Sequence, residues 1–168
     1  MHPSYVEGLG DKSITALREL REECRDAETE VSFERRLCQA RLDILSAELT
    51  RREGGSTEDL VSRLPEILGG ETRQAGANPL PSRAPDFSVP RNVDVPRRRV
   101  EEIVGEQTLA RLADIDSAEL RQILETLAEY EETVSSRRRS IQDVMDKIQG
   151  EIVRRYTSGE ADPTEAFR

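Results

Sequence analysis

The feature that most constrains this chain is a polar pattern, E-x3-S-x2-R-x3-Q-x3-D, that occurs twice, the second copy 103 residues after the first. Because its members are three or four residues apart, an α-helix brings the five side chains of one copy to one face. A solvated helix face has no reason to repeat in register, so the repetition predicts a ligand site of two-fold character. The members are Glu28, Ser32, Arg35, Gln39 and Asp43 in the first copy, and Glu131, Ser135, Arg138, Gln142 and Asp146 in the second.

The two copies belong to a longer internal duplication. Aligning residues 17–52 with 120–155 without gaps gives thirteen identities, of which five are the motif. Helices are predicted over 13–53, which contains no Gly or Pro, and over 117–157, which follows a capping residue at Asp116. Apolar residues spaced by three and four give each helix a coiled-coil seam. The seam residues are Leu17, Leu20, Cys24, Ala27, Val31, Cys38, Leu42, Leu45 and Leu49 in the first helix, and Leu120, Ile123, Leu127, Tyr130, Val134, Ile141, Met145, Ile148 and Ile152 in the second.

The duplication also predicts how the helices pair. If the two motifs meet at one level in an antiparallel pair, residue numbers across the seam add up to about 173. The core slot that lacks an apolar residue then holds Glu34 on one helix and Arg137 on the other, and we expect them to form an ion pair that favours pairing within the chain. Gly150, opposite Ala47 in the repeat, is expected to permit close approach of the other helix. The predicted fold is all-α, a long antiparallel two-helix coiled-coil hairpin that is monomeric before it meets a partner.

The remaining segments are expected to be flexible. Residues 1–12 and 158–168 are predicted to be flexible ends, and 54–116 a long, partly disordered connection with a Pro-rich middle. Two pieces of the connection, 57–68 and 97–115, have the pattern of short amphipathic helices. Such pieces either pack back on the hairpin or bind a partner. We expect partner binding.

Composition narrows the classes of function. A net charge of −9 disfavours a general DNA or RNA binder, which needs a basic surface. The N-terminus lacks the pattern of a signal peptide, and no apolar stretch approaches membrane-spanning length, so a cytoplasmic protein without membrane contact is expected. Cys24 and Cys38 lie about 21 Å apart along one helix, too far for a disulfide, and are expected in the core.

The motif residues suit recognition better than catalysis. The only histidine, His2, lies in a predicted flexible end, so a Ser or Cys nucleophile has no base. Glu28 and Asp43 are about 22 Å apart along the helix, unlike the ligands of a compact metal site. No enzyme activity and no metal are therefore expected. Arg can donate to O6 and N7 of guanine, carboxylates can accept from its N–H groups, and Ser can donate to phosphate. A cyclic dinucleotide has the two-fold symmetry of the site.

Two copies of this motif on an antiparallel helical pair resemble the RsiG family of anti-sigma factors from sporulating actinomycetes. The resemblance covers both long helices, and all ten motif positions match. It implies that the ten residues bind a dimer of cyclic di-GMP, two molecules per chain, and that the loaded form sequesters a sporulation sigma factor of the WhiG type. It makes Arg35, Arg138, Asp43 and Asp146 the main candidates for guanine contacts.

A second interpretation remains open. The polar stripes would bind a protein, and the chain would be a coiled-coil adaptor that works without a nucleotide. That interpretation predicts no change on adding a nucleotide and tolerance of conservative changes such as Asp43→Asn.

Overall fold

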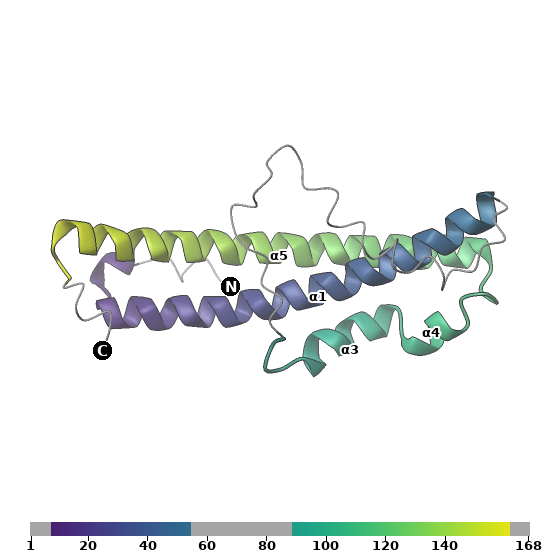
Figure 1. The fold of residues 1–168 in the computed structure, drawn as a ribbon, viewed down its shortest axis with the longest axis horizontal. Helices are drawn as coiled ribbons and strands as arrows, with labels where there is room; N and C mark the ends of the chain where they lie inside the picture. The colour runs from purple at the N-terminus through teal and green to yellow at the C-terminus, as the bar shows by residue number, and fades with distance from the viewer. Residues whose placement is uncertain (1–7, 55–88, 162–168) are drawn as a thin grey trace.

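Two long antiparallel helices form the molecule (Figure 1). The computed structural model describes residues 8–54 and 89–161. These residues contain no strand, and the two long helices lie side by side in opposite directions, which confirms the predicted all-α hairpin. The helices are the short 3-10 helix η2 (Leu9–Asp11), α1 (Ile14–Gly54), α3 (Asp94–Ile103), α4 (Glu106–Ala110) and α5 (Ser117–Ser158).

Capping residues set the bounds of the long helices. The Asp116 carboxylate accepts hydrogen bonds of 2.8 Å from two backbone N–H groups in the first turn of α5. At the other end of α5, Gly159 has a φ of 77°, a left-handed conformation that costs glycine little. Ser13 Oγ accepts from the backbone N–H of Ala16 at the start of α1, at 3.2 Å. The observed helices therefore begin and end within one residue of the predicted ranges 13–53 and 117–157.

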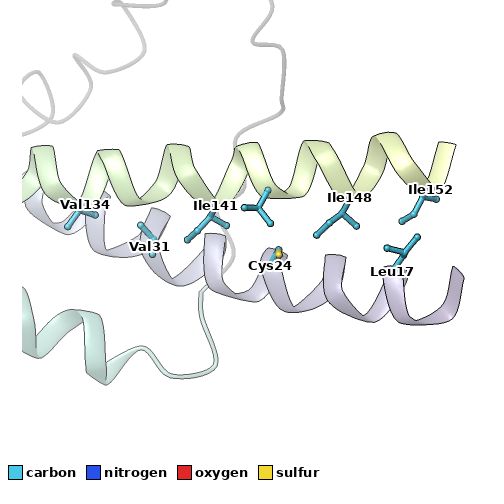
Figure 2. Packing of buried hydrophobic residues seen from close by; sticks show 8 residues of the cluster. Leu17, Cys24, Val31, Val134, Ile141, Ile148 and Ile152 are labelled. Carbon is cyan, nitrogen blue, oxygen red and sulfur yellow. The ribbon is translucent and has the colours of Figure 1, made fainter. Parts of the chain in front are cut away.

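The predicted apolar seam forms the core between α1 and α5. Figure 2 shows one part of it, where Leu17, Cys24 and Val31 of α1 face isoleucine and valine side chains of α5. Cys24 and Cys38 are both buried and free, as expected. We call this part, whose buried residues all belong to α1 and α5, the two-helix core. Its buried residues are Leu17, Cys24, Val31, Val134, Ile141, Val144, Ile148 and Ile152.

The other part of the seam is covered by α3 and the chain that follows it. Figure 1 shows α3 and α4 lying along the hairpin toward the end where α1 finishes and α5 begins. Val100 and Val104 are fully buried here, so the expectation that 97–115 binds a partner rather than packing back is wrong. The physical reason is that the apolar face of this segment buries itself on α1 and α5. We call this part the covered core, and its buried residues are Cys38, Leu45, Val100, Val104, Leu112, Ile115, Leu120 and Leu127.

Polar contacts fix α3 to one place on α1. Arg41 donates to the backbone carbonyl of Val104 at 2.6 Å, just after α3 ends. Arg99 of α3 lies 3.4 Å from the carboxylate of Glu34 and 3.9 Å from that of Glu30. The α5 counterparts of Glu30, Glu34 and Arg41 in the repeat differ from them in charge or polarity. The duplication therefore provides only one docking place for α3. These counterparts are Thr133, Arg137 and Val144.

Each long helix also holds the segment that leads into the other one. Near the end of α1, Arg52 donates to the carbonyl oxygens of Leu112 (2.6 Å) and Ile115 (2.5 Å), which precede α5. The repeat-related arginine of α5 makes the matching contacts with the segment before α1. Two of its acceptors lie 103 residues before Leu112 and Ile115, and so are their counterparts in the repeat. Arg155 donates to the carbonyl oxygens of Leu9 (2.8 Å), Gly10 (3.0 Å) and Lys12.

A glutamate orients each of these arginines. Glu48 accepts from Nε of Arg51 at 2.8 Å and of Arg52 at 2.7 Å, and these hydrogen bonds, Arg51 first, lower the pKa of its buried carboxyl to about 2. Glu151 accepts from the next arginine pair along α5 in the same way, and its pKa is also lowered to about 2. We call these two groups the end clamps. Their members are Glu48, Arg51 and Arg52, and Glu151, Arg154 and Arg155.

The register of the hairpin is close to that predicted. Arg18 bonds to the hydroxyl of Tyr156, and Arg121 bonds to Glu53 at 2.7 Å, each one residue from the partner that the duplication predicts. The expectation for Gly150 is wrong, because it is exposed and a Cβ there would meet nothing within 4 Å. The predicted helical piece 57–68 lies outside the described residues. None of the described helices is both long and apolar enough to cross a bilayer.

Candidate functional site

The two motif copies interlock across the seam. The Glu and Ser of one copy meet the Arg and Gln of the other, so each cluster of four residues is built from both helices. The two clusters are related by the duplication and lie next to each other along the hairpin. We call the first half-site A, formed by Glu28, Ser32, Arg138 and Gln142, and the second half-site B, formed by Glu131, Ser135, Arg35 and Gln39.

Half-site A is closed by hydrogen bonds centred on Glu28. Its Oε1 accepts from Ser32 Oγ at 2.8 Å, from Arg138 Nε at 3.0 Å and from Gln142 Nε2 at 3.1 Å. Arg138 Nε also donates to Ser32 Oγ at 2.9 Å. The guanidinium of Arg138 is thus held through its inner nitrogen, while the side chain remains 33% exposed. Its two terminal NH2 groups form a planar fork, a geometry that can donate to guanine or to phosphate.

Half-site B has the same residues and a looser geometry. Glu131 Oε1 accepts from Ser135 Oγ at 2.8 Å and from Gln39 Nε2 at 3.2 Å. Arg35 approaches Glu131 only through a terminal nitrogen, at 3.7 Å. Arg35 Nε and Gln39 Oε1 are buried and have no hydrogen-bond partner. Half-site B therefore has buried polar atoms without a partner, whereas no side-chain atom of half-site A is both buried and unpaired.

The two motif aspartates lie outside these clusters. Each follows its glutamine by four residues, one helical turn further along. Asp43 is half-buried, and burial raises the pKa of its carboxyl above the ordinary range. Asp146 is exposed. The structure thus gathers eight of the ten predicted site residues into two clusters and leaves the two aspartates at the outer ends of the polar stripe.

A buried glutamate lies beside half-site B. Glu34 is fully buried, and its carboxylate accepts from Tyr130 Oη at 2.5 Å. Arg99 lies 3.4 Å away and Arg137 4.0 Å away, which confirms the predicted pairing of Glu34 with Arg137 and adds two closer partners. The predicted place of Arg137 in the core slot is wrong, because its side chain is 48% exposed and reaches Glu34 from the edge of the seam. Burial, then the hydrogen bond to Glu34, raises the pKa of the Tyr130 hydroxyl.

The half-sites and α3 occupy opposite flanks of the seam. On α1, Glu34 and Arg41 are seven residues apart and contact α3 or the residue after it. Glu28 and Arg35 are also seven residues apart, on the other flank of the seam residue Val31, and contact the motif of α5. The motif stripe is therefore separate from the surface that α3 covers.

The chemistry of the stripe is that of a polar binding surface. Arginine forks, amides, hydroxyls and carboxylates alternate along it, and among residues 8–54 and 89–161 no cluster of His, Cys, Asp and Glu has an arrangement able to hold a metal ion. Such a set can donate to phosphate oxygens and to the O6 and N7 atoms of guanine, and can accept from the guanine N–H groups.

Comparison with known proteins agrees with the geometry. A search of curated proteins finds no match for this chain. The sequence profile of a family described as RsiG-like matches residues 3–68 and 106–167, which include both motif copies. This match spans both long helices and more than half of the chain. The chain therefore belongs to the RsiG-like family of regulatory anti-sigma factors.

Proposed function

We propose that this protein is an anti-sigma factor that binds cyclic di-GMP, and that it sequesters a sporulation sigma factor of the WhiG type when it carries two cyclic di-GMP molecules. The observation that carries the proposal is the pair of half-sites. The same four residue types are assembled twice, side by side, from two helices that the sequence duplicates. A ligand made of two equal halves, each with a guanine and a phosphate, matches that arrangement.

The roles of the residues follow from their chemistry. Arg35 and Arg138 supply planar forks for O6 and N7 of guanine or for phosphate oxygens. Asp43 and Asp146 lie one helical turn beyond the glutamines and accept from the guanine N1–H and N2–H groups. Two cyclic di-GMP molecules carry four negative charges, and binding beside the motif arginines stabilises them.

Ligand binding is coupled to pairing of the helices. Both half-sites draw residues from α1 and α5, so only the closed hairpin presents them. A ligand that binds only this state stabilises it in proportion to the logarithm of its concentration over its dissociation constant. The loaded stripe then becomes part of the surface that the sigma factor recognises.

A second candidate has one observation in its favour. Half-site A satisfies its own hydrogen bonds without a ligand, because Glu28 accepts from Ser32, Arg138 and Gln142. In an adaptor that needs no nucleotide, these contacts would only join the two helices. Unsatisfied Arg35 and Gln39 atoms in half-site B favour the nucleotide-binding proposal instead.

The decisive experiment is isothermal titration of the full chain with cyclic di-GMP, with cyclic di-AMP as the control ligand. Saturable binding of two molecules of cyclic di-GMP per chain, with no binding of cyclic di-AMP, is expected. Arg35→Ala and Arg138→Ala should each weaken it strongly. Arg111→Ala, at an exposed position directly after α4 and outside both long helices, is the control and should bind like the wild type.

The partner is tested with a purified sigma factor of the WhiG type. Size-exclusion chromatography should show a complex only when cyclic di-GMP is present, and the motif variants should lose it. Complex formation that is independent of the nucleotide and survives Arg138→Ala would support the adaptor and contradict the proposed mechanism.

A further inference from the structure

Helix α3 is tied to both long helices at one buried group. The carboxylate of Glu34 is fully buried on α1, accepts from Tyr130 Oη of α5 at 2.5 Å, and lies 3.4 Å from Arg99 of α3. A buried carboxylate is stable only when it is paired and hydrogen-bonded. Glu34 therefore draws its partners from α5 and α3 together.

This three-way contact adjoins half-site B along both helices. Arg35 directly follows Glu34, and Glu131 directly follows Tyr130. Because a helix is stiff over one residue, the spacing between Glu34 and Tyr130 constrains the spacing between Arg35 and Glu131. The position of Arg99 thus acts on the two charged residues of half-site B through the backbones that carry them.

Half-site A lacks such a tie. The residue before Glu28 is Ala27, the repeat counterpart of Tyr130, and it has no polar group to bond across the seam. The residue before Arg138 is Arg137, which lies 4.0 Å from Glu34 and has a 48% exposed side chain. The anchors of α3 on α1 likewise have no counterparts of the same type on α5.

The two half-sites differ as this tie predicts. In half-site A, Arg138 Nε donates to Glu28 at 3.0 Å and to Ser32 at 2.9 Å. In half-site B, Arg35 remains 3.7 Å from Glu131, and its buried Nε has no partner. A buried donor without a partner is costly, and a ligand atom that accepts from it removes that cost. Half-site B is held open, whereas half-site A has closed on itself.

We propose that α3 is a positioning element for half-site B, and that Arg99 is the residue through which it acts. Docking of α3 holds Glu34 and Tyr130 in place and so keeps Arg35 away from Glu131, where it can meet a nucleotide. Arg99 itself does not touch the ligand. Binding at half-site B depends on α3, and binding at half-site A does not. The role in binding rests on the proposed function, whereas the positioning of Arg35 can be measured without a nucleotide.

The first test therefore uses the ligand-free chain. Nuclear magnetic resonance of a ¹⁵N-arginine-labelled sample follows the Nε–H signals of Arg35 and Arg138, assigned through Arg35→Lys and Arg138→Lys. We expect Arg99→Ala to shift the Arg35 signal and leave the Arg138 signal in place, and Arg99→Lys to restore it in part. Arg98→Ala removes a neighbouring exposed arginine of α3 and should shift neither signal. Equal shifts of both signals, or no shift of either, would overturn the proposal.

The second test is a double-mutant cycle in cyclic di-GMP titrations. Arg138→Ala leaves half-site B intact, and Arg35→Ala leaves half-site A intact. We expect Arg99→Ala to weaken binding about fivefold or more in the Arg138→Ala background. It should have no effect in the Arg35→Ala background, and Arg98→Ala should have none in either. Equal effects in the two backgrounds, or loss of all binding in both single variants, would contradict a separate dependence of half-site B on α3.

The two tests separate the inference from the proposed function. If the wild-type chain binds no cyclic di-GMP, the proposed function fails, and with it the role of α3 in nucleotide binding. A wild-type chain that binds two molecules while Arg99→Ala changes neither the spectra nor the titrations leaves the proposed function intact and removes the inference alone.

Discussion

Half-sites A and B have the same four residue types on the same two helices, yet their geometries differ. Half-site A lies at the two-helix core, where α1 and α5 meet each other alone, and its arginine is engaged by Glu28 and Ser32. Half-site B lies where the covered core begins, beside the contact of Glu34 with α3, and its arginine is 3.7 Å from the nearest acid. The difference arises outside the motif, in residues that the duplication does not share.

The comparison shows how a duplicated chain becomes asymmetric. Glu34 and Arg41 attach α3 to one flank of α1, and their counterparts Arg137 and Val144 cannot attach a second copy. A third helix then buries one part of the seam and not the other. Identical motifs therefore lie in surroundings that α3 covers unequally, and variants at repeat-related positions measure how much that difference contributes to stability.

The largest expected difference concerns the two parts of the core. Leu17 and Leu120 are repeat-related and fully buried, Leu17 in the two-helix core and Leu120 in the covered core. Replacing either by Ala should lower the free energy of unfolding by about 2–5 kcal/mol, with the larger loss for Leu120→Ala, because covered surroundings collapse less around a cavity. Urea unfolding followed by circular dichroism measures both. A larger loss for Leu17→Ala would mean that α3 adds little rigidity.

The next difference concerns the end clamps and pH. The pKa values of Glu48 and Glu151 are both lowered from 4.5 to about 2, so the stability that each contributes is complete above pH 4.5 and is lost as the pH falls toward about 2. We expect Glu48→Gln to flatten the pH dependence of unfolding in this window. Glu151→Gln should do so less, because the Glu151 side chain is 16% exposed and that of Glu48 only 4%.

That pH prediction is checked by urea unfolding at a series of pH values between 2 and 5. Glu129→Gln, at an exposed position of α5, is the control and should keep the wild-type slope. A Glu48→Gln variant whose stability falls with acid as steeply as the wild type would show that the lowered pKa has no effect on folding.

A smaller difference is expected between the two motif arginines in the absence of ligand. Arg138→Ala removes two close hydrogen bonds to Glu28 and Ser32 and should cost about 1 kcal/mol of stability, since the side chain is partly exposed. Arg35→Ala removes only a longer ion pair and should cost less than half as much. Thermal unfolding of the ligand-free variants distinguishes them. Equal losses of stability in the two variants would mean that the difference between the half-sites does not lie in how their arginines are bound.

A small effect of opposite sign is expected at Gly150. An added Cβ meets nothing within 4 Å, and the residue lies inside α5, so Gly150→Ala should stabilise the chain by about 0.5–1 kcal/mol. The reverse change at the repeat-related position, Ala47→Gly, should destabilise it by a similar amount. Paired urea unfolding curves test this, and a destabilised Gly150→Ala would restore the close approach first expected there.

Sequence patterns predict the long helices and their pairing well, for identifiable reasons. The run without Gly or Pro, the cap at Asp116 and the end at Gly159 are local signals, and they set helix bounds. The duplicated motif supplies the register, because placing the two copies at one level fixes the offset between the helices. Burial of Cys24 and Cys38 follows from the same seam.

Other features leave no local signal. Spacing within one helix does not say that Glu28 meets Arg138 rather than Arg35, since that depends on the offset across the seam. The amphipathic pattern of 97–115 is the same whether it covers its own hairpin or a partner. The seam pattern treats Tyr130 as an apolar residue and does not reveal its hydroxyl contact with Glu34, although an acid in a core slot signals a need for donors. The end clamps bind backbone carbonyls, which carry no side-chain signature.

The end clamps make the pairing of the helices independent of the chain that connects them. Arg52 donates hydrogen bonds to the carbonyl oxygens of Leu112 and Ile115, which lie 60 and 63 residues later in the chain. Arg155 does the same for the segment before α1. Alignment is therefore set by contacts at the helix ends. Lengthening a connection adds only a slowly growing closure entropy. We therefore expect a lengthened or cleaved connection between α1 and α3 to leave half-sites A and B aligned.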